Sequence, residues 1–168
     1  VMTEKKPLSS VEWKVLAELL ERARWPFESS AFDALSGVTV TDPIELLVFN
    51  DQGQISMSPR ADKYVGLHMP GTVLRDNEDV PTAIKRLVAR ELPGADVTPP
   101  LSLGWKEVHK GTGEGENPYR HEISLIHSCH LREPWKDSEF FDPANLPDNT
   151  LSHHKLLIGE AMARLSRK

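Results

Sequence analysis

Residues 68–94 read HMPGTVLRDNEDVPTAIKRLVARELPG, and this stretch decides the fold. Its second half predicts a helix over residues 81–92, because Pro81 suits a first helical turn and Pro93 ends the pattern. Asp79 stands where it can cap the first turn. Apolar residues at helical spacing then form one arc, which predicts a face packed on a core: Ile84, Leu87, Val88 and Leu92.

Glu91 falls inside this apolar arc. A carboxylate on a core-facing stripe is costly unless it is paired, hydrogen-bonded or bound to a metal. Two interpretations stay open at this point. Either the side chain reaches water or an arginine at the end of the helix, or Glu91 belongs to a site.

The chain on either side of this helix alternates strands and helices. The order of elements, αββ(β)αββα, predicts a sheet covered by helices on both faces, which is an α/β fold. The expected strands and turns are residues 38–40, 44–49, 54–58, 101–109 and 121–131, with a turn at 50–53, loop and short strand at 60–76, and a polar Pro-rich segment at 132–149. The expected flanking helices are one that opens with a capping box at Ser9 and ends at Pro26, and one over residues 151–166.

The bulk properties suit one globular domain of 168 residues. The expected division is an N-terminal helical extension, residues 1–37, and a main domain, residues 38–168. A net charge of −5 argues against general nucleic-acid binding. The single cysteine, Cys129, excludes a disulfide within the chain and predicts a cytoplasmic protein, and no apolar run is long enough for a membrane helix.

The quoted stretch resembles the Nudix box, G-x5-E-x7-R-E-U-x-E-E-x-G-U, in which U is aliphatic. The spacing fits without a gap. Glu78, Arg86, Val88 and Glu91 match the box, and Gly71 matches the glycine that usually precedes it.

The stretch also departs from the box at several positions. Thr72 stands at the box glycine, and Pro93 stands at the late glycine. Leu87 and Arg90 replace two of the three glutamates of the R-E-U-x-E-E segment. The Nudix likeness extends over residues 38–165 and implies an α/β/α sandwich with a mixed sheet, to which the N-terminal helix is an addition.

In function, the resemblance implies metal-dependent hydrolysis of a nucleoside diphosphate linked to another moiety, with Mg²⁺ or Mn²⁺ as cofactor and a small nucleotide or diphosphate as partner. Membranes and nucleic acids are not expected partners. The alternative is a catalytically impaired Nudix-fold domain that has a nucleotide-binding or regulatory role. The missing carboxylates at Leu87 and Arg90 favour this alternative, whereas the retained Glu78, Arg86 and Glu91 favour the enzyme.

The resemblance also implies roles for single residues. Glu91 is the expected main metal ligand, together with the Gly71 carbonyl and Glu78. Arg86 is expected to orient Glu91 or Glu78, so that Glu78, Arg86 and Glu91 form the expected catalytic set.

Further residues are expected around this set. Arg60 and Arg90 are expected to contact phosphates. Glu114 and Glu116, on a glycine-rich hairpin tip, and Glu122, on the following strand, are candidate replacement metal ligands.

Three other patterns have ordinary explanations. Residues 111–116 resemble a phosphate loop but lack the Lys-Ser/Thr and the helix that such a loop needs, so a plain hairpin tip is favoured. His127 and Cys129 share a strand face from which His130 points away, which favours burial over a zinc site. The histidines at 153–154 are expected to be a surface or packing pair.

Overall fold

The computed structural model describes residues 7–23, 27–136 and 139–167 and confirms the predicted α/β fold. Its elements are α1 (Ser10–Arg22), α2 (Ser29–Ser36), β1 (Val40–Thr41), β2 (Pro43–Phe49), β3 (Ile55–Ala61), β4 (Val65–His68), β5 (Gly71–Val73), α3 (Val80–Glu91), β6 (Leu101–Val108), β7 (His121–His130), β8 (Glu139–Phe141) and α4 (Ser152–Leu165).

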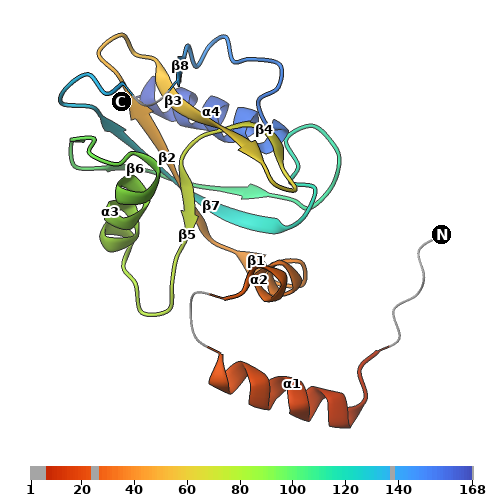
Figure 1. Ribbon diagram of the computed structural model, residues 1–168. Coiled ribbons are helices and arrows are strands. Elements are labelled where there is room, and N and C mark those ends of the chain that lie inside the picture. The colour runs from red at the N-terminus through yellow and green to blue at the C-terminus, as the bar shows by residue number, and fades with distance from the viewer. Residues whose placement is uncertain (1–6, 24–26, 137–138, 168) are drawn as a thin grey trace.

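The sheet is mixed and is built around β2. On one side β2 pairs in parallel with β7, which in turn pairs antiparallel with β6. On the other side β2 pairs antiparallel with β5 near its start and with β3 at its end. β4 and β8 pair with β3, and β1 pairs in parallel with β7 (Figure 1).

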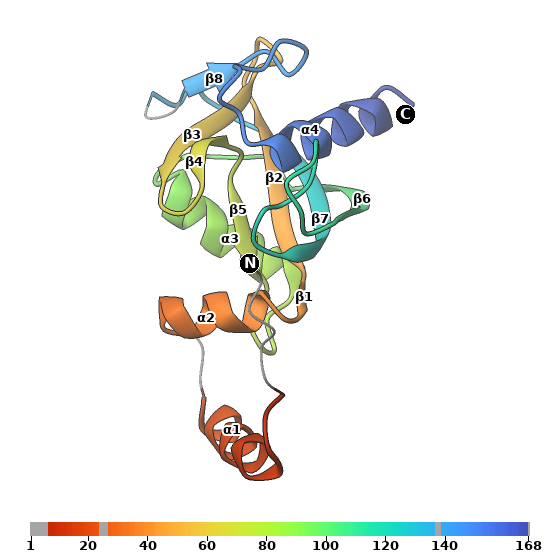
Figure 2. The same ribbon diagram turned by 90° about the vertical axis from the view of Figure 1, so that its right-hand side faces the viewer.

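Every residue of β2 is buried, because helices cover both faces of the sheet. Leu47 and Phe49 point to the face that packs against α4. Ile44, Leu46 and Val48 point to the opposite face, where α3 lies. Figure 2 shows α3 and α4 on the two sides of β2.

Helix α3 lies where it was predicted and buries the predicted apolar face. Asp79 is its N-cap and accepts from the Thr82 backbone N–H at 2.8 Å, and a proline stands in the first turn. Ile84 is buried as expected, whereas Val88 is half-buried. Leu87 is completely buried in the core under α3, so this position faces the sheet rather than solvent.

The N-terminal segment contains two helices, one of which the sequence pattern did not indicate. Helix α1 begins with the predicted capping box of Ser9 and Glu12, has no buried residue and stands apart from the sheet in Figure 1. It ends at Arg22, and the expected end at Pro26 lies outside the described residues. Helix α2, predicted as a connection, forms because Glu28 caps it by accepting from the Ser30 N–H.

The strand predictions need two other corrections. The first short strand covers Val40–Thr41 rather than residues 38–40. The Pro-rich segment, predicted without strands, contributes β8, which extends the sheet by pairing with β3. No helix in the described part of the chain has both the length and the apolar character needed to cross a membrane.

Candidate functional site

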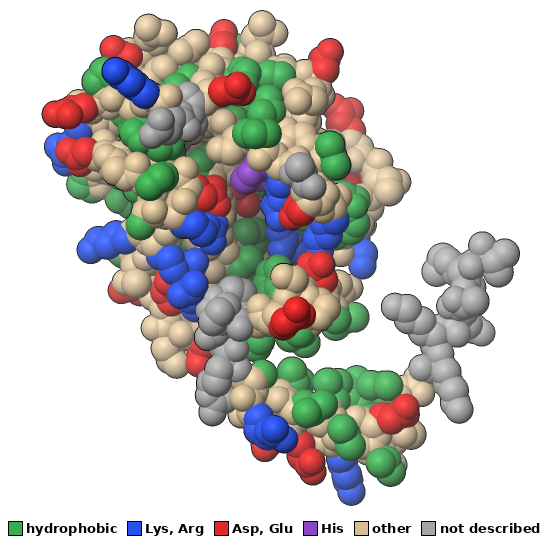
Figure 3. Space-filling view, in the orientation of Figure 1, with side chains coloured by type: hydrophobic (Ala, Val, Ile, Leu, Met, Phe, Trp, Pro, Cys, Tyr) green, Lys and Arg blue, Asp and Glu red, His purple; other side chains and the backbone are tan. Residues whose placement is uncertain are grey.

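A cleft of about 670 Å³ opens on the α4 side of the sheet. Its walls come from α2, β2, the β3–β4 connection, the end of α3, the start of β7 and the start of α4, and Gly71 with its neighbours borders it. Figure 3 shows the hollow, with Lys and Arg side chains on both sides and a histidine at its edge. Segments far apart in the sequence therefore meet here.

Glu91 enters the cleft from the last residue of α3. Its side chain is 19% exposed, and Arg90 Nη2 donates to Glu91 Oε1 at 2.5 Å. The same nitrogen donates to the Gly71 carbonyl oxygen at 2.8 Å. Glu91 Oε2 is buried and has no hydrogen-bond partner. Pairing with an arginine, the first interpretation, is confirmed for one oxygen of Glu91, and the other oxygen is unpaired.

Glu45 is a second carboxylate in the cleft, placed there by the otherwise apolar strand β2. Its Oε2 is buried without a hydrogen-bond partner. Burial, followed by the charge of Glu122, raises the pKa of Glu45 well above its ordinary value. A Cβ at Gly71 would lie 2.7 Å from Glu45 Oε2, so glycine at position 71 allows this carboxylate to approach the backbone.

Glu122 is the third carboxylate and lies at the start of β7. It is 1% exposed, and Arg120 Nε lies 2.6 Å from its Oε1, while Oε2 is buried without a partner. Burial raises the pKa of Glu122, and the positive charge of Arg120 opposes that shift. The cleft thus contains three carboxylate oxygens that are buried and unpaired, on Glu45, Glu91 and Glu122.

Each cation that lines the cleft has an acidic partner. The pairs are Arg60–Asp62, Lys63–Asp33, Arg90–Glu91 and Arg120–Glu122. Among the described lining residues, Glu45 is the acid that pairs with no Lys or Arg.

The pairs differ in how readily they can open. The side chains of Arg60 and Asp62 are 31% and 49% exposed, whereas those of Arg120 and Glu122 are 12% and 2% exposed. Exposed ion pairs contribute about 0–1 kcal/mol, so the Arg60–Asp62 pair opens at a smaller cost than the buried pair. Opening the buried pair would leave a charge without compensation.

Histidines form one wall of the cleft. His153 and His154 are each 4% exposed, and His68 contacts the His154 ring edge-on with centroids 5.8 Å apart. Burial lowers the pKa of all three rings, that of His153 to about 4, so they are neutral at neutral pH. His154 Nδ1 lies 3.8 Å from Glu45 Oε2, too far for a hydrogen bond, and is unpaired.

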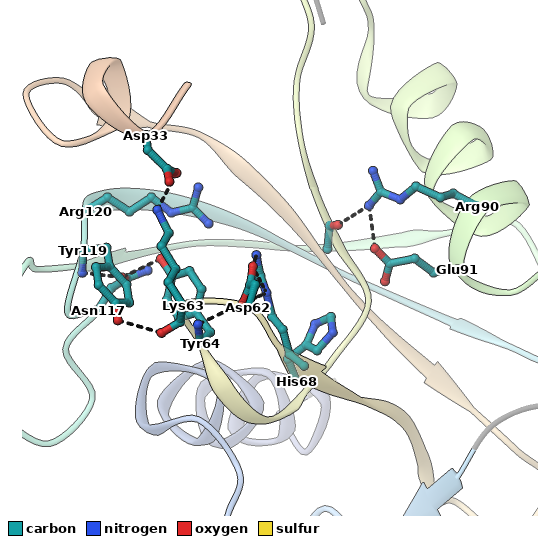
Figure 4. A network of polar contacts seen from close by, with 12 residues as sticks. Asp33, Asp62, Lys63, Tyr64, His68, Arg90, Glu91, Asn117, Tyr119 and Arg120 are labelled. Atoms are coloured by element: carbon teal, nitrogen blue, oxygen red, sulfur yellow. Dashed lines mark hydrogen bonds and ion pairs between the residues drawn. The ribbon is translucent and has the colours of Figure 1, made fainter. Parts of the chain in front are cut away.

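Aromatic rings adjoin the histidine wall, where the Tyr64 ring centroid lies 5.7 Å from that of His153. Tyr64 donates to Asn117 Oδ1 at 2.9 Å and contacts the Tyr119 ring edge-on. The guanidinium of Arg60 lies 4.5 Å from the Tyr64 ring centroid, and that of Arg120 lies 5.7 Å from the Phe32 ring centroid. Figure 4 shows Tyr64, Tyr119 and Arg120 across the cleft from Arg90 and Glu91. Tyr64 is 2% exposed, so the flat apolar surface open to the cleft comes from the half-buried Phe32, beside the charge of Arg120.

Glu78 and Arg86 lie close to the cleft but do not line it. Both oxygens of Glu78 accept from Arg86, each at 2.7 Å. Arg86 also donates to Thr72 Oγ1 and to the Val73 carbonyl oxygen. These bonds tie the segment after Gly71 to α3.

The expected replacement ligands are dispersed. Glu122 lines the cleft, whereas Glu114 and Glu116 do not. Glu116 Oε2 accepts from the Gly113 N–H at 2.7 Å and so closes the hairpin tip, and Glu114 is exposed.

No protein-family model and no curated protein sequence matches the chain. Solved structures do match it. A candidate asymmetric diadenosine tetraphosphate (Ap4A) hydrolase from Jonesia denitrificans has a TM-score of 0.59 at 15% identity, covering 77% of this chain and 97% of that one. A NUDIX hydrolase from Nitrosomonas europaea has a TM-score of 0.56 at 13% identity, covering 77% and 90%. The chain has the Nudix fold. A UDP-X diphosphatase has a TM-score of 0.59 at 15% identity and covers 92% of this chain and 78% of its own.

Leu87 and Arg90, which lie near Glu91 on α3, have distinct environments. Leu87 is fully buried in the core, where a carboxylate would be costly. Arg90 is exposed and occupies the Gly71 carbonyl and one oxygen of Glu91. The chain therefore assembles its cleft carboxylates from Glu45 and Glu122 on the sheet as well as from the helix.

Sequence reasoning missed Glu45 and did not place the histidine pair in the cleft. A glutamate within the buried strand PIELLVF was a signal, by the argument that was applied to Glu91. His153 and His154 are buried, which confirms the expectation of a packing pair, and they form part of the cleft wall. His127 and Cys129 are buried as expected, and burial raises the pKa of the Cys129 thiol to about 12.

Proposed function

We propose that this chain is a metal-dependent hydrolase that cleaves a nucleoside diphosphate linked to another moiety. The observation that supports the proposal most strongly is the set of unpaired, buried carboxylate oxygens on Glu45, Glu91 and Glu122 in one cleft. Buried carboxylates without partners are costly, and a bound cation is the simplest compensation.

The residues present fit a hard divalent cation such as Mg²⁺ or Mn²⁺, which takes oxygen ligands. Glu91, the Gly71 carbonyl and Glu45, whose carboxylate adjoins Gly71, are the groups that would hold it. When bound, such an ion neutralises diphosphate charge and activates water for attack on phosphorus. Arg90 must release the Gly71 carbonyl for that to happen, which its 51% exposed side chain allows.

The other side chains of the cleft bind and orient the substrate. Arg60 and Lys63 exchange their exposed carboxylate partners, Asp62 and Asp33, for phosphate oxygens. The half-buried Phe32, which lines the cleft, provides flat surface for a nucleobase.

Glu122 is the candidate proton acceptor. Its Oε2 is unpaired, while Arg120 holds Oε1 and so fixes the direction of the carboxylate. A general base needs this combination of a fixed direction and a free lone pair.

Glu78 and Arg86 receive a positioning role in this proposal. Because Arg86 occupies both oxygens of Glu78 and also bonds Thr72 and Val73, the pair holds Gly71 in register with α3. Metal ligation by Glu78, which the resemblance implied, would require Arg86 to break its hydrogen bonds to Glu78.

One observation favours the alternative, a catalytically impaired domain that binds a nucleotide. Arg90 places a positive charge on two of the groups that a metal would use, and Leu87 offers no ligand. The cleft would then bind anions through Arg60 and Lys63 without cleaving them.

Product release separates the two proposals. The protein is incubated with Mg²⁺ or Mn²⁺ and a panel of nucleotide sugars, dinucleoside polyphosphates and nucleoside triphosphates, and nucleoside monophosphate or phosphate is measured. Two structural neighbours, a UDP-X diphosphatase and a candidate Ap4A hydrolase, motivate the first two classes. Turnover of at least one class supports the enzyme, whereas calorimetric binding without turnover supports the alternative.

A further inference from the structure

Glu107, His109 and His121 form a cluster outside the cleft. Glu107 and His109 are two positions apart at the end of β6, so their side chains share a face. In the antiparallel register Val108 lies opposite Glu122, and continuing it places His109 opposite His121. The sheet itself therefore brings the three side chains together.

The donor atoms of the cluster converge. One ligand atom from each residue lies within 4.8 Å of the others. His121 Nε2 lies 2.8 Å from Glu107 Oε1, and the His109 and His121 ring centroids are 5.1 Å apart. In the described part of the chain, no Lys or Arg forms an ion pair with Glu107.

We propose that Glu107, His109 and His121 bind a divalent transition metal of the Zn²⁺ class. Two imidazole nitrogens and a carboxylate oxygen form a ligand set that suits Zn²⁺ and its neighbours in the first transition row. Both histidines and Glu107 are accessible, Glu107 being 45% exposed, so solvent or a further donor can complete a tetrahedral shell. This site goes beyond the proposed hydrolase and does not depend on it.

The simpler interpretation is an exposed hydrogen bond between His121 and Glu107. Such a pair contributes little and would not require His109 to stand beside it. His109 directly follows β6, and the β6–β7 register, if continued, places it opposite His121. This position favours the metal, because donors next to a paired backbone lose little chain entropy when an ion binds.

The proposed metal site lies next to the cleft in the sequence. His121 lies between Arg120 and Glu122, which both line the cleft. Because successive side chains of a strand point to opposite faces, a metal on His121 would bind to the outer surface of the segment whose inner surface forms the cleft wall. Metal binding would therefore tie β6 to the start of β7 and stabilise that wall.

Co²⁺ titration of the metal-free full chain tests the proposal, because tetrahedral Co²⁺ has an intense visible absorption band and Zn²⁺ displaces it. The expected result is one equivalent bound by the wild type. His109→Ala and His121→Asn should each weaken binding by at least about tenfold, since even an outer partner of a metal ligand contributes about 10- to 100-fold. Circular dichroism checks that both variants fold.

Two matched controls locate the ion. His130→Ala removes an exposed histidine from the other end of β7 and should leave the band unchanged. Glu91→Gln changes the cleft and should also leave it unchanged, which separates this site from the proposed hydrolase. Absence of stoichiometric Co²⁺ and Zn²⁺ binding in the wild type, or an undiminished band in folded His109→Ala and His121→Asn, would overturn the proposal.

Discussion

Arg90 Nη2 donates both to the Gly71 carbonyl oxygen and to Glu91 Oε1, at 2.8 and 2.5 Å. One exposed arginine thereby occupies two groups that the proposal assigns to a metal. The cleft still retains unpaired carboxylate oxygens on Glu45, Glu91 and Glu122. A cation and the Arg90 guanidinium compete for the Gly71 carbonyl oxygen, and the Mg²⁺ affinity of the protein measures this competition.

The first prediction concerns Mg²⁺ affinity. The free wild type should bind Mg²⁺ weakly, with a Kd of about 10⁻³ M, as expected for an under-ligated oxygen site. Arg90→Ala should bind at least about fivefold more tightly, since one unit charge about 4 Å away contributes about 1 kcal/mol even at the dielectric constant of water. Lys85→Ala, an exposed cation on the same helix, is the matched control for calorimetry. Equal affinities of Arg90→Ala and the wild type would show that Arg90 does not compete with the metal.

The second prediction concerns stability against pH. Hydrogen bonds from Arg86 lower the pKa of Glu78 from its ordinary value of 4.5 to about 2. Because the folded pKa is lower, ionised Glu78 stabilises the fold above pH 4.5, and this contribution is lost as the pH falls toward 2. Glu78→Gln should lower the free energy of unfolding at pH 7 by about 1.5–3 kcal/mol.

Urea unfolding at a series of pH values checks this second prediction. The difference between wild type and Glu78→Gln should shrink steadily from pH 5 to pH 2, since protonation removes the charge that the variant lacks. A difference that does not change over this range would mean that the pair does not stabilise the fold through its charge.

The sequence predicted the fold better than it predicted the site. The strands 44–49 and 121–131 and the helix 81–92 follow from local patterns of burial, capping and proline, and the structure has them within a residue or two. Helix α2 and strand β8 depend on a short cap and on pairing with β3, which local periodicity does not encode.

The site depends on contacts between distant segments. Glu91 was found because its position on the helical wheel conflicted with its charge. Glu45 meets Gly71 through the antiparallel pairing of β2 with β5, and the parallel pairing of β2 with β7 brings Glu122 near. The histidines at 153–154 join them from the last helix. The resemblance led to the box residues and to Glu122 as a candidate ligand, but it did not indicate Glu45.

The third prediction concerns the buried position 87. Leu87→Glu with Arg90→Glu recreates the box trio in sequence, but Leu87 is completely buried in the core under α3. The introduced charge should lower the free energy of unfolding by about 3–5 kcal/mol. Leu87→Met keeps the volume and should cost less than about 1.5 kcal/mol. Unchanged urea stability of the double variant would show that the carboxylate introduced at position 87 reaches the cleft instead.

The fourth prediction concerns the proton acceptor. If turnover is found, Glu122→Gln should lower kcat by about 10²- to 10⁴-fold with a smaller change in KM, because the amide preserves the shape and the contact with Arg120 but accepts no proton. Steady-state kinetics separate the two constants. An unchanged kcat, or a change confined to KM, would remove Glu122 from the chemistry and leave it a binding role.

The most direct test of the proposed hydrolase compares nucleoside monophosphate release by the wild type, Glu91→Gln and Glu133→Gln with the best substrate of the panel and Mg²⁺. Glu133 is exposed and lies outside the cleft, so it controls for loss of one surface charge. The proposal predicts that Glu91→Gln lowers kcat/KM by about 10²-fold or more while Glu133→Gln matches the wild type. Equal release by a folded Glu91→Gln protein and the wild type would contradict it.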